Sequence, residues 1–317
     1  MELQQLEDVR KVYAKKLKIV ITLALTVLFL SIFLASASYI TFFDNLTHTL
    51  GYAPILGFVI IILSIPLIIV SIFAYQDSKD YKKLYKSYFV ERSLKQVFTD
   101  IHYDHTQGMP IEALRQTDMI RTGDVYESDD FFAGKYHDVA LSQADVHILI
   151  RQESDDTTSY STIFKGRWMV FEFPKKFNFR LQVVSKHFAA RKKPSKDPNT
   201  KRSFERISTE SPTFDRKFKV YAEDGFEAYY ILDPAFIDHI EKLSSAHKGK
   251  LLLCFIDNKL SVAIDDRNNA FEAPNPLKPI DEAKEIAKVS QEIKTITDFV
   301  DFLKLDHKLF QGDKGAK

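Results

Sequence analysis

The residues whose types and spacing come closest to a chemical site lie in one short stretch, which contains Asp100, His102, Asp104 and His105. On a helix, Asp100 and Asp104 would share one face and His102 and His105 another, and two imidazoles with two carboxylates can ligate zinc. No distant residue that would complete such a site is recognisable, and a His-x-x-His pair alone is a weak signal. We therefore interpret these residues as the polar end of a helix and predict no metal site. Asp100, His102 and His105 are the candidates that an experiment would test.

The sequence matches none of the common cofactor-binding patterns. Gly134-Lys135-Tyr136 and Gly249-Lys250-Leu251 lack the upstream glycine and the hydroxyl residue of a phosphate-binding loop. With only 10 glycines, the chain also lacks a dinucleotide-binding fingerprint, and it has no Ser-centred nucleophile elbow. The sequence therefore predicts no cofactor. Because catalytic triads assemble from distant positions, it leaves open whether the protein is an enzyme.

The acidic pairs and the single cysteine predict structural roles. The three pairs occupy loop-like stretches, so we interpret them as solvated turn residues rather than general acid/base partners. Cys254 cannot form an intramolecular disulfide, which suits a reducing cytoplasm. Its position in the apolar run Leu251–Ile256 predicts a buried thiol rather than a nucleophile. The acidic pairs are Asp129–Asp130, Asp155–Asp156 and Asp265–Asp266.

Two apolar runs without any charge, Ile19–Ile40 and Ile55–Ala74, are each long enough to span a bilayer. They predict a transmembrane helical hairpin over residues 19–75. A cleaved signal peptide is the rival interpretation of the first run, because Ala35-Ser36-Ala37 is a small-residue stretch. The run is longer than a signal core, so we favour a retained helix.

The basic residues predict the orientation of this hairpin. The connecting loop Thr41–Pro54 contains no Lys or Arg, whereas both outer flanks are basic, and such flanks stay in the cytoplasm. We therefore expect a multi-pass protein of the plasma membrane with both termini cytoplasmic. The flanking residues are Arg10, Lys11, Lys15, Lys16 and Lys18 before the first span, and Lys79, Lys82, Lys83, Lys86, Arg92 and Lys95 after the second.

The remaining segments are predicted in order along the chain. Residues 1–18 form a basic N-terminal segment, and residues 76–107 a juxtamembrane helix with a tyrosine-rich face. Residues 108–310 form a cytoplasmic α+β domain, and 311–317 a polar tail. Within the domain, residues 190–206 are basic and contain two prolines, which predicts a mobile loop. We favour a solvated insertion for this loop over contact with anionic lipid headgroups.

Between residues 130 and 185, apolar residues recur with a period of two, which is typical of strands. The connections are too short for crossover helices, so the strands should pair antiparallel. We expect Pro174-Lys175-Lys176 to break the last two into a hairpin. The predicted strands are Phe131–Asp138, Ala144–Arg151, Arg167–Phe173 and Phe179–Ser185.

The second half of the domain mixes strands and helices. Asp233-Pro234 is a good helix start, and this helix should run to about Ser245. Asp257-Asn258 predicts a tight turn between two strands. The last predicted helix, Ile280–Leu309, has apolar residues from Ile286 to Leu303 at alternating spacings of three and four. This seam permits a homo-oligomer, but its wide apolar face favours packing on the sheet. The predicted strands are Phe214–Ala222, Gly225–Leu232, Leu251–Asp257 and Leu260–Ile264.

Four stretches of the chain carry a family resemblance: Phe164–Val170, Phe214–Tyr221, Glu227–Phe236 and Ile296–Leu303. They resemble a bacterial membrane family, domain of unknown function 3137. The resemblance implies a bacterial inner-membrane protein. It carries no established catalytic residue, substrate or cofactor.

Together these patterns predict an α+β protein with two transmembrane helices forming a hairpin, followed by a cytoplasmic domain of antiparallel β-hairpins flanked by helices. The net charge of +1 argues against a nucleic-acid binder. We expect a membrane-tethered scaffold or sensor whose partners are the lipid bilayer and a protein. The alternative is a membrane-bound enzyme acting on lipid or envelope precursors, with Asp100, His102 and His105 as its site.

Overall fold

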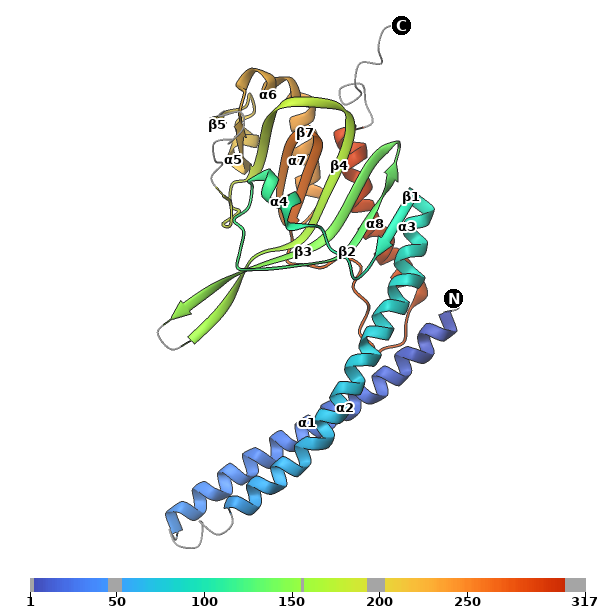
Figure 1. The fold of residues 1–317 in the computed structure, drawn as a ribbon, viewed down its shortest axis with the longest axis vertical. Helices are drawn as coiled ribbons and strands as arrows, with labels where there is room; N and C mark the ends of the chain where they lie inside the picture. The colour runs from blue at the N-terminus through green and yellow to red at the C-terminus, as the bar shows by residue number, and fades with distance from the viewer. Residues whose placement is uncertain (1–2, 45–52, 155–156, 193–202, 306–317) are drawn as a thin grey trace. The chain divides into compact units, whose positions relative to one another are not determined.

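Long apolar stretches without breakers form the first two helices, α1 (Leu3–Asp44) and α2 (Ala53–Tyr85). The computed structural model describes residues 3–44, 53–154, 157–192 and 203–305, and these form two compact units (Figure 1). The first unit comprises residues 1–89 with 272–285, and the second comprises residues 90–271 with 286–317. The connecting loop at 45–52, the acidic pair at 155–156, the centre of the predicted basic loop at 193–202 and the tail lie outside the described residues.

In the first unit, α1 and α2 pack against each other. Lys16 Nζ lies 2.8 Å from a carboxylate oxygen of Asp77, and the rings of Tyr13 and Tyr81 are 6.0 Å apart. Within the described residues, two helical stretches are long and apolar enough to cross a membrane, Leu3–Phe33 and Ile60–Val97. The predicted N-terminal segment 1–18 is not a separate helix, because α1 continues from Leu3 without interruption.

The tyrosine-rich face of α2 packs on the segment 272–285. Tyr81 Oη donates to the carbonyl oxygen of Pro274 at 3.2 Å, and Tyr85 Oη donates to Glu285 at 2.7 Å. Just after the end of α2, Tyr88 Oη donates to Glu282 at 2.9 Å. Tyr81 and Tyr85 are buried. This face is therefore used for packing within the chain.

The helical stretch that continues from α2 ends earlier than the predicted helix over residues 76–107. It continues as a π-helical turn, η2 (Lys86–Glu91), and then as α3 (Arg92–Val97). The prediction of a helix over 76–107 is wrong beyond this point, because strand β1 (Thr99–Asp104) pairs antiparallel with its neighbour in the sheet. The hydrogen bonds of this strand pair replace those of a helix. Short local patterns could not indicate this replacement, because the partner strand is distant in the chain.

The second unit is built on one antiparallel sheet, which confirms the α+β class. In the part of the chain that the structure describes, seven strands are hydrogen-bonded in the order β1-β2-β3-β4-β6-β5, and β7 also pairs with β4. All pairs are antiparallel. The strands after β1 are β2 (Val125–Tyr136), β3 (Val139–Ser154), β4 (Thr157–Ser185), β5 (Glu205–Ile207), β6 (Phe218–Ala222) and β7 (Lys250–Asp265).

Two predicted hairpins turn out to be bends in long strands. The predicted strands Arg167–Phe173 and Phe179–Ser185 are both parts of β4, and the two strands predicted around Asp257 are both parts of β7. β4 and β7 pair with each other on both sides of the bend, with register shifts between Glu172 and Leu181. Pro174 falls in this irregular stretch, where a missing N–H donor costs no ladder hydrogen bond. The prediction of hairpins at these two places is therefore wrong.

Side-chain caps explain the helices of the second half. The predicted strand Gly225–Leu232 is instead a helix, α6 (Gly225–Ile231), because Asp224 Oδ1 accepts from the backbone N–H of Phe226 at 2.9 Å. α5 (Pro212–Lys217) replaces the start of another predicted strand and is capped by Ser211. The helix predicted at Asp233-Pro234 is confirmed as α7 (Pro234–Ala246), where Asp233 Oδ1 accepts from Phe236 N–H at 2.7 Å.

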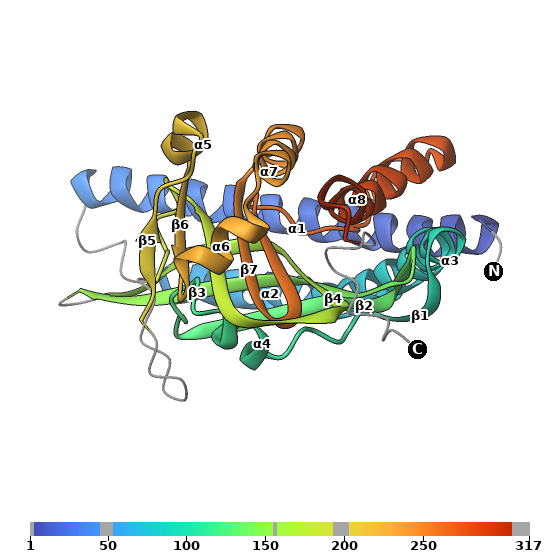
Figure 2. The same ribbon diagram turned by 90° about the horizontal axis from the view of Figure 1, so that it is seen from above.

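Helices cover both faces of the sheet (Figure 2). On one face, α4 (Ile111–Thr117) packs over a core that includes Trp168. On the other face lie α7 and α8 (Glu282–Leu303), and the ring of Phe171 contacts that of Phe299 on α8. The seam of α8 is buried against its own chain, except for Ile286, which is 46% exposed. The buried seam residues are Val289, Ile293, Ile296, Val300 and Leu303.

Candidate functional site

Two neighbouring rows of ionisable residues cross the sheet at β2, β3 and β4. In one row, Asp129 pairs with Asp145, which in turn pairs with Arg167. In the next row, Glu127 pairs with His147, which pairs with Lys165. Side chains directly opposite on antiparallel strands point to the same face, and so do residues two apart on one strand. The rows therefore form one polar patch on one face of the sheet.

A β-bulge adds a third carboxylate to the first row. The β2–β3 register shifts between Asp129 and Phe132, and Asp130 within the bulge has a left-handed φ of 54°. As a result, ligand oxygens of Asp129, Asp130 and Asp145 all lie within 4.8 Å of one another. Asp130 is fully buried, and Asp145 is only 2% exposed. We call these three residues the acidic cluster.

Asp145 is the least satisfied member of the acidic cluster. Its Oδ2 accepts from the backbone N–H of Ala270 at 2.5 Å, but its Oδ1 has no hydrogen-bond partner among the described residues. Burial raises the pKa of Asp145 well above its usual value, and the negative charge of Asp130 adds to this shift. Asp130 itself accepts from Tyr103 Oη at 2.8 Å.

The buried guanidinium of Arg167 neutralises the acidic cluster only in part. Its charge opposes the upward shift of the Asp145 pKa. However, Arg167 Nη1 donates to the carbonyl oxygen of Glu292 at 3.0 Å, and its Nη2 forms an ion pair with the Glu292 carboxylate. Burial lowers the pKa of Arg167. One buried cation is thus shared between a buried aspartate and a glutamate on α8.

The acidic cluster opens into a polar pocket of about 390 Å³. Asp129 and Asp145 are among its lining residues. The other lining residues are Glu127, Ser128, Val146, His147, Lys165 and Asn269.

At the rim of the pocket, His147 links a carboxylate to a hydroxyl. Its Nδ1 lies 3.1 Å from Glu127 Oε2, and its Nε2 lies 2.9 Å from Thr162 Oγ1. A hydroxyl, an imidazole and a carboxylate in this order are the parts of an activated nucleophile. Which ring nitrogen carries the proton, and therefore which one donates, depends on the tautomer.

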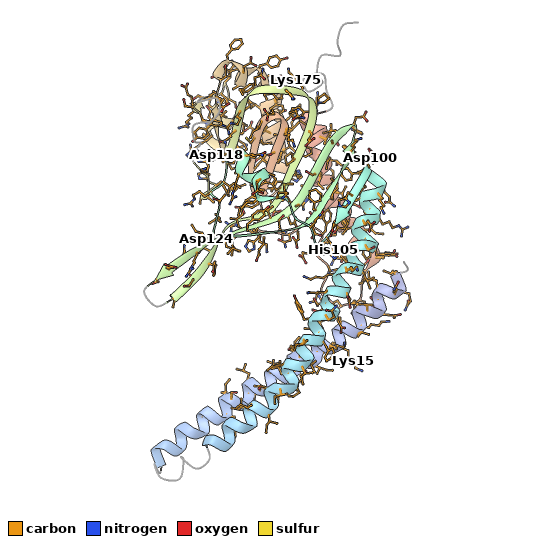
Figure 3. All side chains as sticks on the ribbon, viewed as in Figure 1. Lys15, Asp100, His105, Asp118, Asp124 and Lys175 are labelled. Atoms are coloured by element: carbon orange, nitrogen blue, oxygen red, sulfur yellow. The ribbon has the colours of Figure 1, made fainter. Side chains whose placement is uncertain are left out.

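The candidates Asp100, His102 and His105 do not lie on a helix. They lie on or next to β1, and Figure 3 shows Asp100 and His105 near opposite ends of this strand. The carboxylate of Asp100 pairs instead with Lys135 Nζ at 2.7 Å. Among the described residues, the acidic cluster is the group of three potential metal ligands whose atoms lie close together.

The interpretation of Asp129–Asp130 as solvated turn residues is wrong, because both lie in β2 and Asp130 is buried. Asp265 is also buried, at the end of β7. The available signal was the pair of phenylalanines after Asp130, which indicates a strand rather than a loop. The prediction of a buried Cys254 is confirmed, and burial raises the pKa of its thiol.

A family model matches the chain from within β4 to just after the end of α8. Residues 162–305 match the model of a family described as "Protein of unknown function (DUF3137)". This segment carries the DUF3137 pattern. The predicted resemblance is confirmed there, and Arg167 and Lys165 lie inside the DUF3137 segment, whereas the acidic cluster lies before it.

Other comparisons add little. No curated protein matches the chain. One similar solved structure is the crystal structure of the mycobacterial trehalose monomycolate transport factor A, TtfA, which is 11% identical in sequence. The match covers 71% of this chain and 94% of that one, with a TM-score of 0.37. A score this low carries no functional argument, so the function rests on the chain's own features.

Proposed function

We propose that this protein is a membrane-tethered sensor or scaffold. In this proposal, α1 and α2 anchor the chain in the plasma membrane, both termini are cytoplasmic, and the α+β unit binds a ligand or a protein partner at the inner surface. The polar pocket beside the acidic cluster is the place that we propose for a ligand.

The observation that carries the proposal is the exposure of large apolar side chains along α1 and α2. Phe29 is 72% exposed and Ile72 is 63% exposed. Leaving such side chains in water is unfavourable, and a bilayer removes them from it. Neither helix has the buried apolar stripe of a core helix, since almost none of the apolar stretch of each is buried inside the chain. Further exposed residues are Leu25, Leu28, Ile32, Phe33, Ile61, Ile62, Ile65, Ile68 and Ile69.

Contacts near the start of α1 support a retained helix rather than a cleaved signal peptide. Leu6 is fully buried, and Arg10 Nη1 donates to the carbonyl oxygen of Pro276 at 2.5 Å. Lys16 pairs with Asp77 on α2. Cleavage near Ala37 would remove all of these contacts from the first unit.

Labelling of introduced cysteines tests the topology. Because Cys254 is fully buried, the wild-type chain should give little background with a membrane-impermeant maleimide. In intact bacterial cells that express the protein, we expect Thr47→Cys, in the loop between the apolar runs, to be labelled. Ser159→Cys, at an exposed position of the second unit, should be labelled only after permeabilisation. Labelling of Ser159→Cys in intact cells would contradict the proposed orientation.

The binding role has its own test. Crosslinking of the membrane-embedded full chain, followed by purification, should recover a protein or small molecule in a defined ratio to the chain. Failure to recover any such species across several growth conditions would count against the sensor and scaffold roles, and it would leave the topology result unaffected.

A membrane-bound enzyme is a second candidate, and the arrangement of Thr162, His147 and Glu127 favours it. If Thr162 Oγ1 is an activated nucleophile, a fluorophosphonate probe should label the wild-type chain and fail to label Thr162→Val. His147→Gln should reduce the labelling strongly. Absence of labelling in the wild-type chain would remove this arrangement as evidence for an enzyme.

A further inference from the structure

We propose that Asp129, Asp130 and Asp145 bind a hard divalent cation, of the class of Mg²⁺, Mn²⁺ and Ca²⁺, at the floor of the polar pocket. This inference names a ligand for the pocket of the proposed sensor. It rests on that role only for its biological meaning, because cation binding can be measured whatever the membrane topology is.

The geometry of the acidic cluster suits such an ion. Hard cations take oxygen ligands at about 2.0–2.6 Å, so two oxygens on opposite sides of one ion lie about 4–5 Å apart. The ligand oxygens of the three aspartates all lie within 4.8 Å of one another. They come from a cross-strand pair and from a bulge between two paired strands, and this backbone holds the carboxylates together without the ion.

The charges around the acidic cluster call for a further cation. Asp129 and Asp145 lie directly opposite each other, an arrangement that is unfavourable for like charges. Asp145 is also buried, where an uncompensated carboxylate is costly. Arg167, the buried arginine of this row, already bonds Glu292 through both Nη atoms.

Buried polar atoms without a partner give an independent indication that this place binds a ligand. Oδ1 of Asp145 has no hydrogen-bond partner among the residues that the structure describes, although the side chain is almost completely buried. Gln143 is fully buried two residues earlier on β3, hence on the same face, and neither its Oε1 nor its Nε2 has a described partner. Buried polar atoms are normally satisfied by protein, water or an ion.

The donor set selects the type of ion. All three ligands are carboxylates, which suit Mg²⁺, Mn²⁺ and Ca²⁺ better than the softer metals that favour cysteine and histidine. The pocket is lined by two of the three aspartates, and its volume leaves room for water to complete the coordination shell. A proton shared between Asp130 and Asp145 is the competing way to relieve the repulsion.

The experiment uses the full chain in detergent, treated with EDTA and then freed of it. Mn²⁺ is titrated in while the electron paramagnetic resonance signal of free Mn²⁺ is recorded. We expect one bound Mn²⁺ per chain, displaced by Mg²⁺ or Ca²⁺, and a thermal midpoint that rises with metal concentration. A wild-type chain that binds no Mn²⁺ at millimolar concentration, with no change in its thermal midpoint, would overturn the proposal in favour of a shared proton.

Single substitutions locate the site. Asp145→Asn keeps the shape of the side chain and removes its charge, and it should weaken Mn²⁺ binding at least tenfold. Asp129→Asn, at a half-buried position, should weaken Mn²⁺ binding to a similar extent. It tests the site independently if Asp145→Asn does not fold. The matched control Asp100→Asn removes a strand carboxylate outside the acidic cluster and should leave binding unchanged. Wild-type affinity in both cluster variants would overturn the proposal, and either result leaves the topology test standing.

Discussion

Asp129 on β2 and Asp145 on β3 face each other directly across an antiparallel pair, with ligand oxygens within 4.8 Å. Cross-strand neighbours of like charge normally destabilise a sheet. Here a third aspartate from a bulge joins the pair, and Arg167 lies opposite Asp145 on the other neighbouring strand, β4. The sheet thus holds a charge arrangement that is unfavourable for folding unless a proton or a cation compensates it.

Asp145→Asn should stabilise the metal-free protein. The substitution removes one buried negative charge from beside Asp129 and Asp130, and the amide oxygen can still accept from Ala270 N–H. We expect a gain of about 0.5–1 kcal/mol, measured by thermal unfolding of the full chain in EDTA. Asp145→Ala is the contrasting variant, since it also loses the hydrogen bond to Ala270 and should be less stable than Asp145→Asn. Equal stability of these two variants would contradict the argument.

Arg167→Met should destabilise the protein strongly. Arg167 is the buried cation between Asp145 and Glu292, and its removal leaves both carboxylates uncompensated. Breaking a buried pair in this way costs about 3–5 kcal/mol. The control is Arg151→Met, which removes an exposed arginine 2.8 Å from Glu153 and should change the thermal midpoint little. Similar losses for the two variants would show that burial is not the cause.

Gly166→Ala should disrupt the junction of β4 with β7. Gly166 has a φ of 155°, and a Cβ atom there would lie 2.0 Å from the carbonyl oxygen of Ile264, a backbone atom that cannot move aside cheaply. We expect a loss of at least about 2 kcal/mol or failure to fold.

Gly225→Ala is the matched control for this glycine. In the first turn of α6, its Cβ would meet only Ile207 Cδ1 at 3.8 Å, an ordinary contact. Its effect should lie between neutral and a gain of about 1 kcal/mol, compared by thermal unfolding. A Gly166→Ala protein as stable as the wild type would contradict the close approach of β4 and β7.

His247 should make the protein less stable in mild acid. Burial lowers the pKa of this histidine below its usual value of 6.5, and Asp298 offsets the shift only in part. Below pH 6.5 the unfolded chain therefore binds the proton more readily than the folded chain. The contribution of neutral His247 to the free energy of unfolding is complete above pH 6.5. It is lost progressively as the pH falls from 6.5 to the lower pKa of the folded state.

The measurement is the thermal midpoint of the wild-type chain and of His247→Gln between pH 7.5 and 5. Other groups that titrate in this range do so in both proteins, so the difference between the two curves isolates His247. The wild-type midpoint should fall more than that of the variant over this range. Parallel curves would exclude His247 as the cause.

Features that depend on local composition could be predicted from the sequence. Length and lack of charge define two apolar helices, Asp233-Pro234 starts α7, and the period of two predicts an antiparallel sheet. The apolar run around Cys254 correctly predicts a buried thiol. Each of these features follows from residues that are neighbours in the chain.

The lengths of the strands and the residues that meet across them depend on pairing between distant segments. β4 continues past Pro174 because β7 pairs with it on both sides of the bend. Strand register then places Asp129 opposite Asp145, and a bulge adds Asp130. Register is set by pairing between segments that are separate in the chain, so no local pattern indicated the acidic cluster.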